Sequence, residues 1–229
     1  MLDLKGYGWM LRDGLELTLI VGLCSLAVAT VLGLLGAWGK LSSSSVARGV
    51  AGTYTTVVRG VPELLLILLV YYGTPTLIQN IALSLGYDII IDINPFIAGV
   101  ITIGFIYGAF ATEVFRGAVL AVPKGQLEAA QAYGMSRSQV VRRVLLPQVL
   151  RFALPGLGNV WMVLIKATAL ISVIQLPELV RNAQIAAGST RQPFTFFFAT
   201  AMIFLGITVV STMVQHRLEA WSNRGTGKR

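Results

Sequence analysis

Long apolar stretches alternate with short polar segments along the whole of the 229-residue chain. A helix that crosses the hydrocarbon core of a bilayer needs about 20 mostly apolar residues. Five stretches have that length: 15–38, 61–83, 95–115, 152–176 and 194–215. The pattern therefore predicts an all-α, polytopic membrane protein with about five transmembrane helices, a short segment 1–14 before them and a basic tail 216–229 after them.

The segment 123–147 interrupts this pattern, because it is polar and basic but lies between two apolar stretches. Pro123 suits the first turn of a helix, and Gly134 suits the left-handed position that ends one. Residues 136–139 have the sequence of a capping box, which predicts a second short helix, and Pro147 is expected to stop or kink that helix. Two short helices that meet at a glycine between membrane spans indicate a docking element.

The composition agrees with a membrane protein. Hydrophobic residues make up 55% of the chain and charged residues 12%, with a mean hydropathy of +0.74, whereas a soluble domain is about 25% charged. The net charge of +8 does not indicate nucleic-acid binding here, because the basic residues fall in order between apolar stretches. The stretch 15–38 is longer than the ~7–15 residues of a signal-peptide core, so we do not expect it to be cleaved.

The positions of Lys and Arg predict the orientation of the chain. With five spans, the two termini lie on opposite sides of the membrane. If the C-terminus is placed inside, few basic residues lie outside, namely Lys5, Arg12, Arg181 and Arg191. The loop 81–94 contains Asp88 and Asp92 but no basic residue, as expected of an outer loop. We therefore expect the N-terminus outside and the segment 123–147 inside.

Small residues recur at helical spacing in two of the apolar stretches. The first stretch carries Ser25, Ala29, Gly33 and Ala37, and the third carries Gly104 and Gly108. Such faces let helix backbones approach closely. We expect ordinary packing within the bundle, with a dimer seam as the alternative. No internal repeat is found, which argues against an inverted-repeat carrier folded from this chain alone. Five spans are few for surrounding a polar pathway, so a second membrane subunit is expected.

Sequence motifs for catalysis are not found. No stretch matches the phosphate-binding pattern G-x-x-x-x-G-K-[ST], and a single His (His216) and a single Cys (Cys24) leave no metal cluster. No nucleophile–base pair is recognised either. We expect a chain that is not an enzyme and binds no cofactor or metal itself. If transport is active, a separate ATPase would bind ATP and Mg²⁺.

The polar segment contains a recognisable motif. Glu128, Ala129, Ala130, Gly134, Leu146 and Pro147 follow the spacing E-A-A-x3-G-x9-I-x-L-P, with Val144 in the Ile position. This pattern resembles the EAA motif of permeases in ATP-binding cassette (ABC) importers. The stretches 59–62, 107–117 and 166–170 resemble the amino-acid branch of that family, in particular permeases for histidine, lysine, arginine and ornithine. Many relatives have Thr-Ser-Leu at 168–170, where this chain has Thr-Ala-Leu.

The resemblance implies a type I ABC transporter transmembrane domain over 15–215, with a coupling loop at 123–147. It implies a permease subunit in the bacterial inner membrane, with a periplasmic N-terminus and a cytoplasmic C-terminus. The implied partners are a second homologous permease, two ATPase subunits and a periplasmic amino-acid-binding protein, besides membrane lipid. The motif residues would form a coupling helix lodged in a groove of the ATPase.

The implied function is ATP-driven import of basic amino acids. Alternatives are a permease for another polar amino acid or an opine, and an ATPase-independent channel or carrier subunit. A DNA-binding helix-turn-helix is disfavoured, because membrane spans flank the segment 123–147 tightly on both sides.

Polar residues inside the fourth span are candidates for the solute pathway. Lys166 lies well inside that span, where a charge costs roughly 3 kcal/mol or more. Its ammonium could meet the carboxylate of a passing amino acid, or it could be a structural lysine paired with a neighbouring subunit or with backbone carbonyls. Asn159, Trp161 and Gln175 could line the same pathway or make hydrogen bonds between helices.

Acidic residues near the other spans are expected to be structural. Glu113 and Arg116 are three positions apart, so they can form an ion pair on one helix face. Glu63 is expected to pair with Arg59 in the same way. A cationic substrate would favour a carboxylate at mid-depth in the membrane, and the sequence shows no clear one.

Overall fold

The computed structural model describes residues 4–222, which fold as helices joined by short turns. The α-helices are α1 (Gly8–Leu41), α2 (Ser45–Gly60), α3 (Glu63–Leu68), α4 (Thr74–Ser84), α5 (Pro95–Leu120), α6 (Lys124–Ala132), α7 (Arg137–Val140), α8 (Leu146–Ala167), α9 (Leu179–Thr190) and α10 (Pro193–Ser222). Two π-helical turns (Leu69–Gly73 and Val141–Leu145) and a 3₁₀-helix (Thr168–Ile174) continue three of them. Residues 1–3 of the predicted N-terminal segment and 223–229 of the predicted tail lie outside the described residues.

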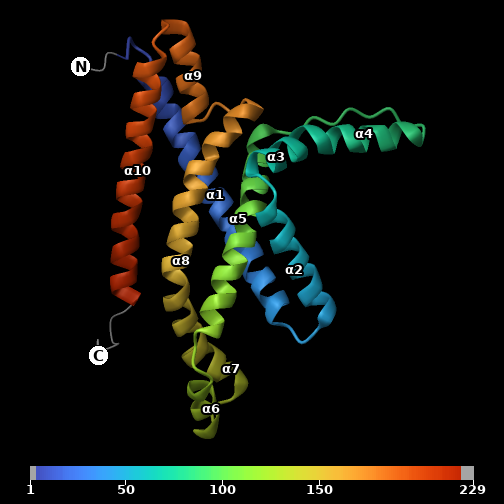
Figure 1. Cartoon of the computed structure of the whole chain (residues 1–229), viewed down its shortest axis with the longest axis vertical. Helices are drawn as coiled ribbons and strands as arrows, with labels where there is room; N and C mark the ends of the chain where they lie inside the picture. The colour runs from blue at the N-terminus through green and yellow to red at the C-terminus, as the bar shows by residue number, and fades with distance from the viewer. Residues whose placement is uncertain (1–3, 223–229) are drawn as a thin grey trace.

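The long helices α1, α5, α8 and α10 run along one axis and form an elongated bundle (Figure 1). The loop with α6 and α7 lies at one end of the bundle, here called the α6 end. Helix α9 and the start of α1 lie at the opposite end, here called the α9 end. Within residues 4–222, five helical segments are long and apolar enough to cross a membrane, and all five overlap the predicted stretches. The prediction of an all-α fold with five spans is confirmed.

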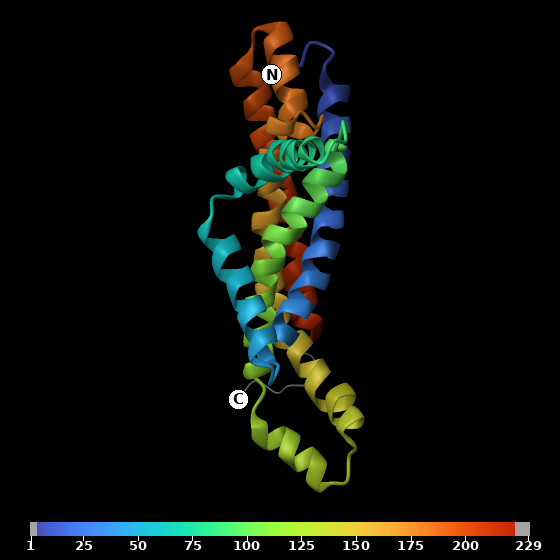
Figure 2. The ribbon, with the colours of Figure 1, turned by 90° about the vertical axis from the view of Figure 1, so that its right-hand side faces the viewer.

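The second apolar stretch has an unexpected shape. Its helix is interrupted by the π-helical turn Leu69–Gly73, and α4 then runs across the bundle axis, as both views show (Figures 1 and 2). No residue of α4 is buried within the chain. Hydropathy predicted the length of this stretch but carries no information on its direction. Its first part, α3 with the π-helical turn Leu69–Gly73, packs against α5.

Helix α2 was not predicted. It is capped by Ser44, whose Oγ accepts a hydrogen bond from the Ala47 N–H, and it packs against α1 and α5. Its buried residues Ala51, Thr55 and Val58 recur every three to four positions, which is the spacing of one helix face. The polar residues on its other face kept this segment below the hydropathy of a membrane span.

The two small-residue faces meet each other inside the chain. Ser25 Oγ donates a hydrogen bond to the Val100 carbonyl at 3.3 Å, which ties α1 to α5. A Cβ atom added at Gly33 would lie 2.6 Å from Ala111 Cβ, and one added at Gly104 would lie 2.5 Å from a Val28 methyl. Backbones this close have no room for larger side chains. The interpretation as packing within the bundle is confirmed for these faces.

Pro147 does not end the helix that precedes it. Helix α7 continues through the π-helical turn Val141–Leu145 directly into α8, so Pro147 is the second residue of α8. Proline has no N–H to continue the helical ladder, and the π-helical turn Val141–Leu145 directly before it accommodates that interruption. Of the two predicted effects of Pro147, stopping or kinking the second short helix, the first is wrong. The interruption takes the form of the π-helical turn before it.

Helix α9 is fastened to the first turns of α1. The Leu179 N–H donates to Thr18 Oγ1 at 3.2 Å, and Asn182 Nδ2 donates to the Met10 carbonyl at 2.8 Å. Gly14 allows this approach, because a Cβ there would lie 2.7 Å from Leu179 Cα. The buried side chain of Glu178 caps α9, accepting hydrogen bonds from the Val180 and Arg181 N–H groups. This network fixes one end of the bundle.

Candidate functional site

The loop at the α6 end projects beyond the long helices (Figure 2). Pro123 immediately precedes α6, and Gly134 follows that helix with φ +82°, in the left-handed region. The Gly134 N–H donates to the Gln131 carbonyl at 2.9 Å, and the Met135 N–H donates to the Ala130 carbonyl at 3.1 Å. These bonds close the helix end in the way that a glycine after a helix allows. The predicted role of Gly134 in ending the helix is confirmed.

The second helix of the loop begins with the predicted capping box. The Ser136 N–H donates to Gln139 Oε1 at 2.9 Å, and the Gln139 N–H donates in return to Ser136 Oγ at 3.4 Å. Both ends of the turn between α6 and α7 are therefore held by local hydrogen bonds. Such a turn is held by its own hydrogen bonds and not by contacts with the bundle.

The residues of the EAA motif differ in burial within this segment. Ala130 is buried, while Glu128, Ala129 and Gly134 are exposed. Leu146 and Pro147, at the start of α8, are exposed as well. Tyr133 is 89% exposed at the exit of α6. The sequence alone assigned no role to Tyr133.

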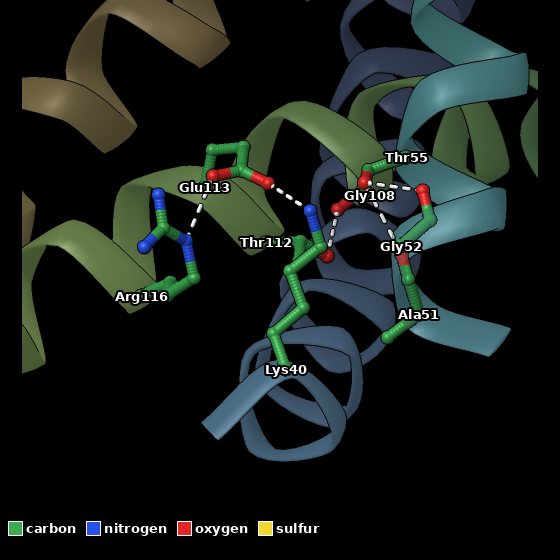
Figure 3. Close-up of polar contacts among 8 residues, drawn as sticks. All are labelled: Lys40, Ala51, Gly52, Thr55, Gly108, Thr112, Glu113 and Arg116. Atoms are coloured by element: carbon green, nitrogen blue, oxygen red, sulfur yellow. Dashed lines mark hydrogen bonds and ion pairs between the residues drawn. The ribbon is translucent and has the colours of Figure 1, made fainter. Parts of the chain in front are cut away.

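Glu113 links two cations near the α6 end of the bundle (Figure 3). Its Oε2 lies 2.9 Å from Arg116 Nε, and its Oε1 accepts a hydrogen bond from the Lys40 ammonium. The pair with Arg116 lies within α5, as the spacing predicts. Lys40 comes from the last turn of α1, 73 positions earlier, and no local sequence pattern could have indicated it. The result is a three-residue ion network that ties α1 to α5.

The expected pair between Glu63 and Arg59 is absent from the described ion pairs, and both side chains contact α5 instead. Tyr107 Oη donates a hydrogen bond to Glu63 Oε1 at 3.0 Å. The Arg59 guanidinium lies over the Phe110 ring, 5.2 Å from its centroid. Tyr107 is near the midpoint of α5 (Pro95–Leu120). Glu63 therefore lies close to the midpoint of α5, a position that the sequence did not reveal.

The four candidates in and after α8 do not form one cluster. Asn159 and Lys166 are both exposed and lie seven positions apart, about two helical turns, on one face of α8. Trp161 turns to a different side, where its Nε1 donates to Ser211 Oγ of α10 at 2.9 Å. Gln175 is exposed in the left-handed region, with φ +64°, where the 3₁₀-helix ends. The structure thus places Asn159 and Lys166 together and separates Trp161 and Gln175 from them.

These features define a polytopic α-helical membrane protein with an exposed, locally rigid loop at one end. The family model described as "Binding-protein-dependent transport system inner membrane component" matches residues 29–221. The chain belongs to this family of inner-membrane permeases, which confirms the expectation drawn from the EAA motif.

Relatives of known name agree over almost the whole length. The chain is 44% identical over 216 residues to the histidine/lysine/arginine/ornithine transport system permease protein HisQ of Escherichia coli, covering 94% of each chain. It is 49% identical over 221 residues to the nopaline transport system permease protein NocQ of Agrobacterium fabrum, covering 96% of this chain and 94% of that one. A solved structure of an amino acid ABC transporter with histidines matches with a TM-score of 0.80 and 31% identity, covering 93% and 94% of the two chains.

Proposed function

We propose that this chain is the permease subunit of an ATP-driven importer that moves basic amino acids across the bacterial inner membrane. Two relatives that cover nearly its full length are named for transport of histidine, lysine, arginine and ornithine in one case and of nopaline in the other. The observation that carries the choice of a cationic substrate is the carboxylate of Glu63 near the middle of the bundle.

Glu63 has the chemistry and the position to meet a cation. Its side chain is only partly buried, and its one hydrogen bond within the described residues comes from the neutral hydroxyl of Tyr107. A carboxylate inside a membrane domain is costly unless it is paired or faces a polar pathway. A guanidinium or ammonium side chain of a passing substrate supplies the missing positive charge.

The face of α8 with Asn159 and Lys166 completes this proposal. Within residues 4–222, neither side chain makes an ion pair or a hydrogen bond. An unpaired ammonium is costly against lipid, so this face belongs against the second permease subunit or the solute pathway. There Lys166 would attract the α-carboxylate that every amino acid carries.

Coupling to ATP hydrolysis is assigned to the loop at the α6 end. The exposed Glu128, Ala129 and Gly134 would seat in a groove of an ATPase on the cytoplasmic side, with Tyr133 at the rim of the contact. The Lys and Arg distribution supports an orientation with this end inside and the N-terminus in the periplasm. ATP and Mg²⁺ would be bound by two ATPase subunits, and a periplasmic binding protein would deliver the substrate.

The test is uptake by proteoliposomes that contain this chain with its second permease and ATPase subunits, supplied with the binding protein. We expect ATP-dependent uptake of labelled arginine, ornithine, lysine or histidine in preference to glutamine and glutamate, with octopine and nopaline included in the panel. Failure of an ATPase to copurify in mild detergent, together with uptake without ATP, would overturn the importer assignment. Preferred uptake of glutamate or glutamine would overturn the substrate assignment.

The role of Glu63 is tested by Glu63→Gln, which removes the charge and keeps the size. Uptake of arginine is expected to fall several-fold, because the counter-charge for the substrate is lost. Glu16→Gln is the matched control, since Glu16 is exposed on α1. Equal uptake by Glu63→Gln and wild type at the same abundance would remove Glu63 from the pathway.

A further inference from the structure

The chain breaks its helical course between α2 and α3, beside the middle of α5. Helix α2 ends at Gly60 and α3 begins at Glu63. The two residues between them, Val61 and Pro62, are extended, with ψ of 137° and 133°, and Figure 2 shows the ribbon leaving α2 before it enters α3. Tyr107, near the midpoint of α5, donates its hydroxyl to Glu63. The break therefore lies beside a membrane-spanning helix, at about the middle of its length.

The last carbonyls of α2 lack hydrogen-bond donors at this break. The carbonyls of the last turn of an α-helix have no partner further along their own helix, and here they belong to residues 57–60. Within residues 4–222, no group outside α2 donates to them, and the Val61 N–H makes no bond back to the helix. Pro62 has no N–H to offer. Irregular backbone at membrane depth is tolerated only inside protein or beside a water-filled cavity, so these carbonyls need a donor from outside this chain.

The charges at the break favour a cation. The C-terminal end of a helix carries the equivalent of about half a negative charge, and the Glu63 carboxylate adds to it. Glu63 receives its one hydrogen bond within the described residues from the neutral Tyr107 hydroxyl, at 3.0 Å. In transporters with broken helices, unwound carbonyls and helix C-termini coordinate cations. A guanidinium or ammonium group suits this arrangement, because it brings several N–H donors and a positive charge.

Arg59 is the cation that could cancel this charge from within the chain, but Phe110 holds it elsewhere. The Arg59 guanidinium lies over the Phe110 ring, 5.2 Å from its centroid, and forms none of the ion pairs found within residues 4–222. The face of an aromatic ring attracts a cation. Phe110 is itself stacked on Tyr107, with ring centroids 5.6 Å apart. The aromatic pair thus supports Arg59 in a place where it does not neutralise Glu63.

We propose that the break between α2 and α3 is a cation-binding site on the solute pathway, formed by Glu63 and the last carbonyls of α2. Phe110 is a positioning residue that keeps this site free by holding Arg59 away from Glu63. The ligand is the charged side chain of the transported amino acid, and in this identity the inference rests on the proposed function. The site itself requires only that the break faces water.

The experiment measures the local charge at the break with thiol reagents. Cys24→Ala removes the one cysteine of the chain, and Gly60→Cys places a thiol at the break, where an added Cβ meets nothing within 4 Å. The assembled transporter in proteoliposomes is treated with cationic trimethylammonium-ethyl methanethiosulfonate or with anionic sulfonato-ethyl methanethiosulfonate, and peptide mass spectrometry gives the rates. We expect both reagents to react, the cationic one several-fold faster than its ratio on free cysteine predicts. Gly117→Cys, exposed and uncrowded on α5, is the control.

Variants then assign the charge preference to the proposed groups. Glu63→Gln should lower the ratio of cationic to anionic rates at Gly60→Cys and leave the ratio at Gly117→Cys unchanged. Phe110→Leu should lower it as well, because Arg59 is released toward Glu63, and adding Arg59→Gln to Phe110→Leu should restore it. Arginine should slow the modification of Gly60→Cys more than citrulline, its uncharged counterpart.

Three results would overturn the proposal. If neither reagent reaches Gly60→Cys, the break is covered by another subunit and does not face the pathway. If Glu63→Gln leaves the ratio unchanged, the carboxylate does not set the charge there. If Arg59→Gln does not restore the ratio in Phe110→Leu, Phe110 has no positioning role.

The labelling ratio requires no transport, so the site and the proposed function are tested separately. Preferred uptake of glutamate with the ratio intact would overturn the substrate assignment alone. Uptake of arginine with no preference for the cationic reagent would overturn the site alone.

Discussion

Lys40 and Glu113 form an ion pair that joins the last turn of α1 to α5 near the α6 end. The side chains are 18% and 23% exposed, and Arg116 binds the other carboxylate oxygen of Glu113. A partly buried pair of this kind is destabilising to break, because one charge is left without its partner. The network therefore fixes the relative position of the two helices that carry the small-residue faces.

The first prediction concerns this network. Glu113→Gln leaves both Lys40 and Arg116 without a counter-charge, and we expect it to lower the free energy of unfolding by about 1–3 kcal/mol. Lys40→Met should cost less, because Glu113 keeps Arg116. Thermal unfolding of the purified transporter measures both effects. In a double-mutant cycle, strictly additive effects of Lys40→Met and Glu113→Gln would show that the pair is not coupled.

The second prediction concerns the crossing of α1 and α5 at Gly36. A Cβ atom added at Gly36 would overlap the side chain of Thr112, so Gly36→Ala is expected to destabilise the protein by about 1–3 kcal/mol. Gly52→Ala is the control, because a Cβ there meets nothing within 4 Å and alanine favours a helix. Adding Thr112→Ala to Gly36→Ala should restore part of the loss. Equal melting temperatures for Gly36→Ala and Gly52→Ala would contradict the close approach.

Local signals predicted much of this structure. The capping box at Ser136 and the left-handed Gly134 follow from the conformational needs of one turn, and the five apolar stretches follow from the thickness of a bilayer. Long-range relationships were not accessible in the same way. Two contacts depend on which helices become neighbours in the fold. Lys40 pairs with Glu113, and Glu63 accepts a hydrogen bond from Tyr107 and does not pair with Arg59.

The direction in which an apolar helix runs, and the side to which its residues point, were also not predictable from the sequence. The segment Glu63–Ser84 has the hydropathy of a span, yet its second part, α4, runs across the bundle axis, since composition reports solvent preference and not orientation. Lys166 and Trp161 are five positions apart on one helix, yet one is exposed and the other contacts α10. Only the packing of α8 against its neighbours distinguishes them.

The third prediction concerns Glu178, which lies between the fourth and fifth spans. Burial raises the pKa of this carboxyl to about 7, against the opposing effect of the Val180 and Arg181 N–H groups. The folded state then binds a proton that the unfolded chain has already lost, so stability is greatest below the ordinary pKa of 4.5 and falls as pH rises toward 7. The loss is roughly 3 kcal/mol at most.

Glu178→Gln should flatten this dependence between pH 4.5 and 7, because it keeps an oxygen acceptor for the cap and removes the titrating group. Melting temperature against pH measures the effect. Asp88→Asn, at an exposed position in the loop before α5, is the control and should leave the curve unchanged. The same slope of melting temperature against pH in wild type and Glu178→Gln over this window would show that the folded-state pKa of Glu178 is not raised.

The fourth prediction concerns Lys166, whose side chain makes no ion pair or hydrogen bond within residues 4–222. Lys166→Met keeps the length and removes the charge, so we expect slower uptake with little change in the melting temperature of the isolated chain. Lys166→Arg should retain most of the uptake. If the methionine variant instead fails to copurify with the second permease, Lys166 serves the contact between subunits, which was the structural alternative.

The fifth prediction concerns Gly134, which allows α6 to end where it does. Its φ of +82° disfavours any side chain by about 1–2 kcal/mol, while the space around it is open. Gly134→Val and Gly134→Asp should therefore insert and fold but shift the exposed face of α6 relative to α7. We expect ATP hydrolysis to continue while uptake is lost, because in the proposed function this loop transmits motion from the ATPase. Gly125→Ala, within α6 and without a crowded neighbour, is the control. The prediction fails if either Gly134 variant transports at the wild-type rate for equal membrane abundance.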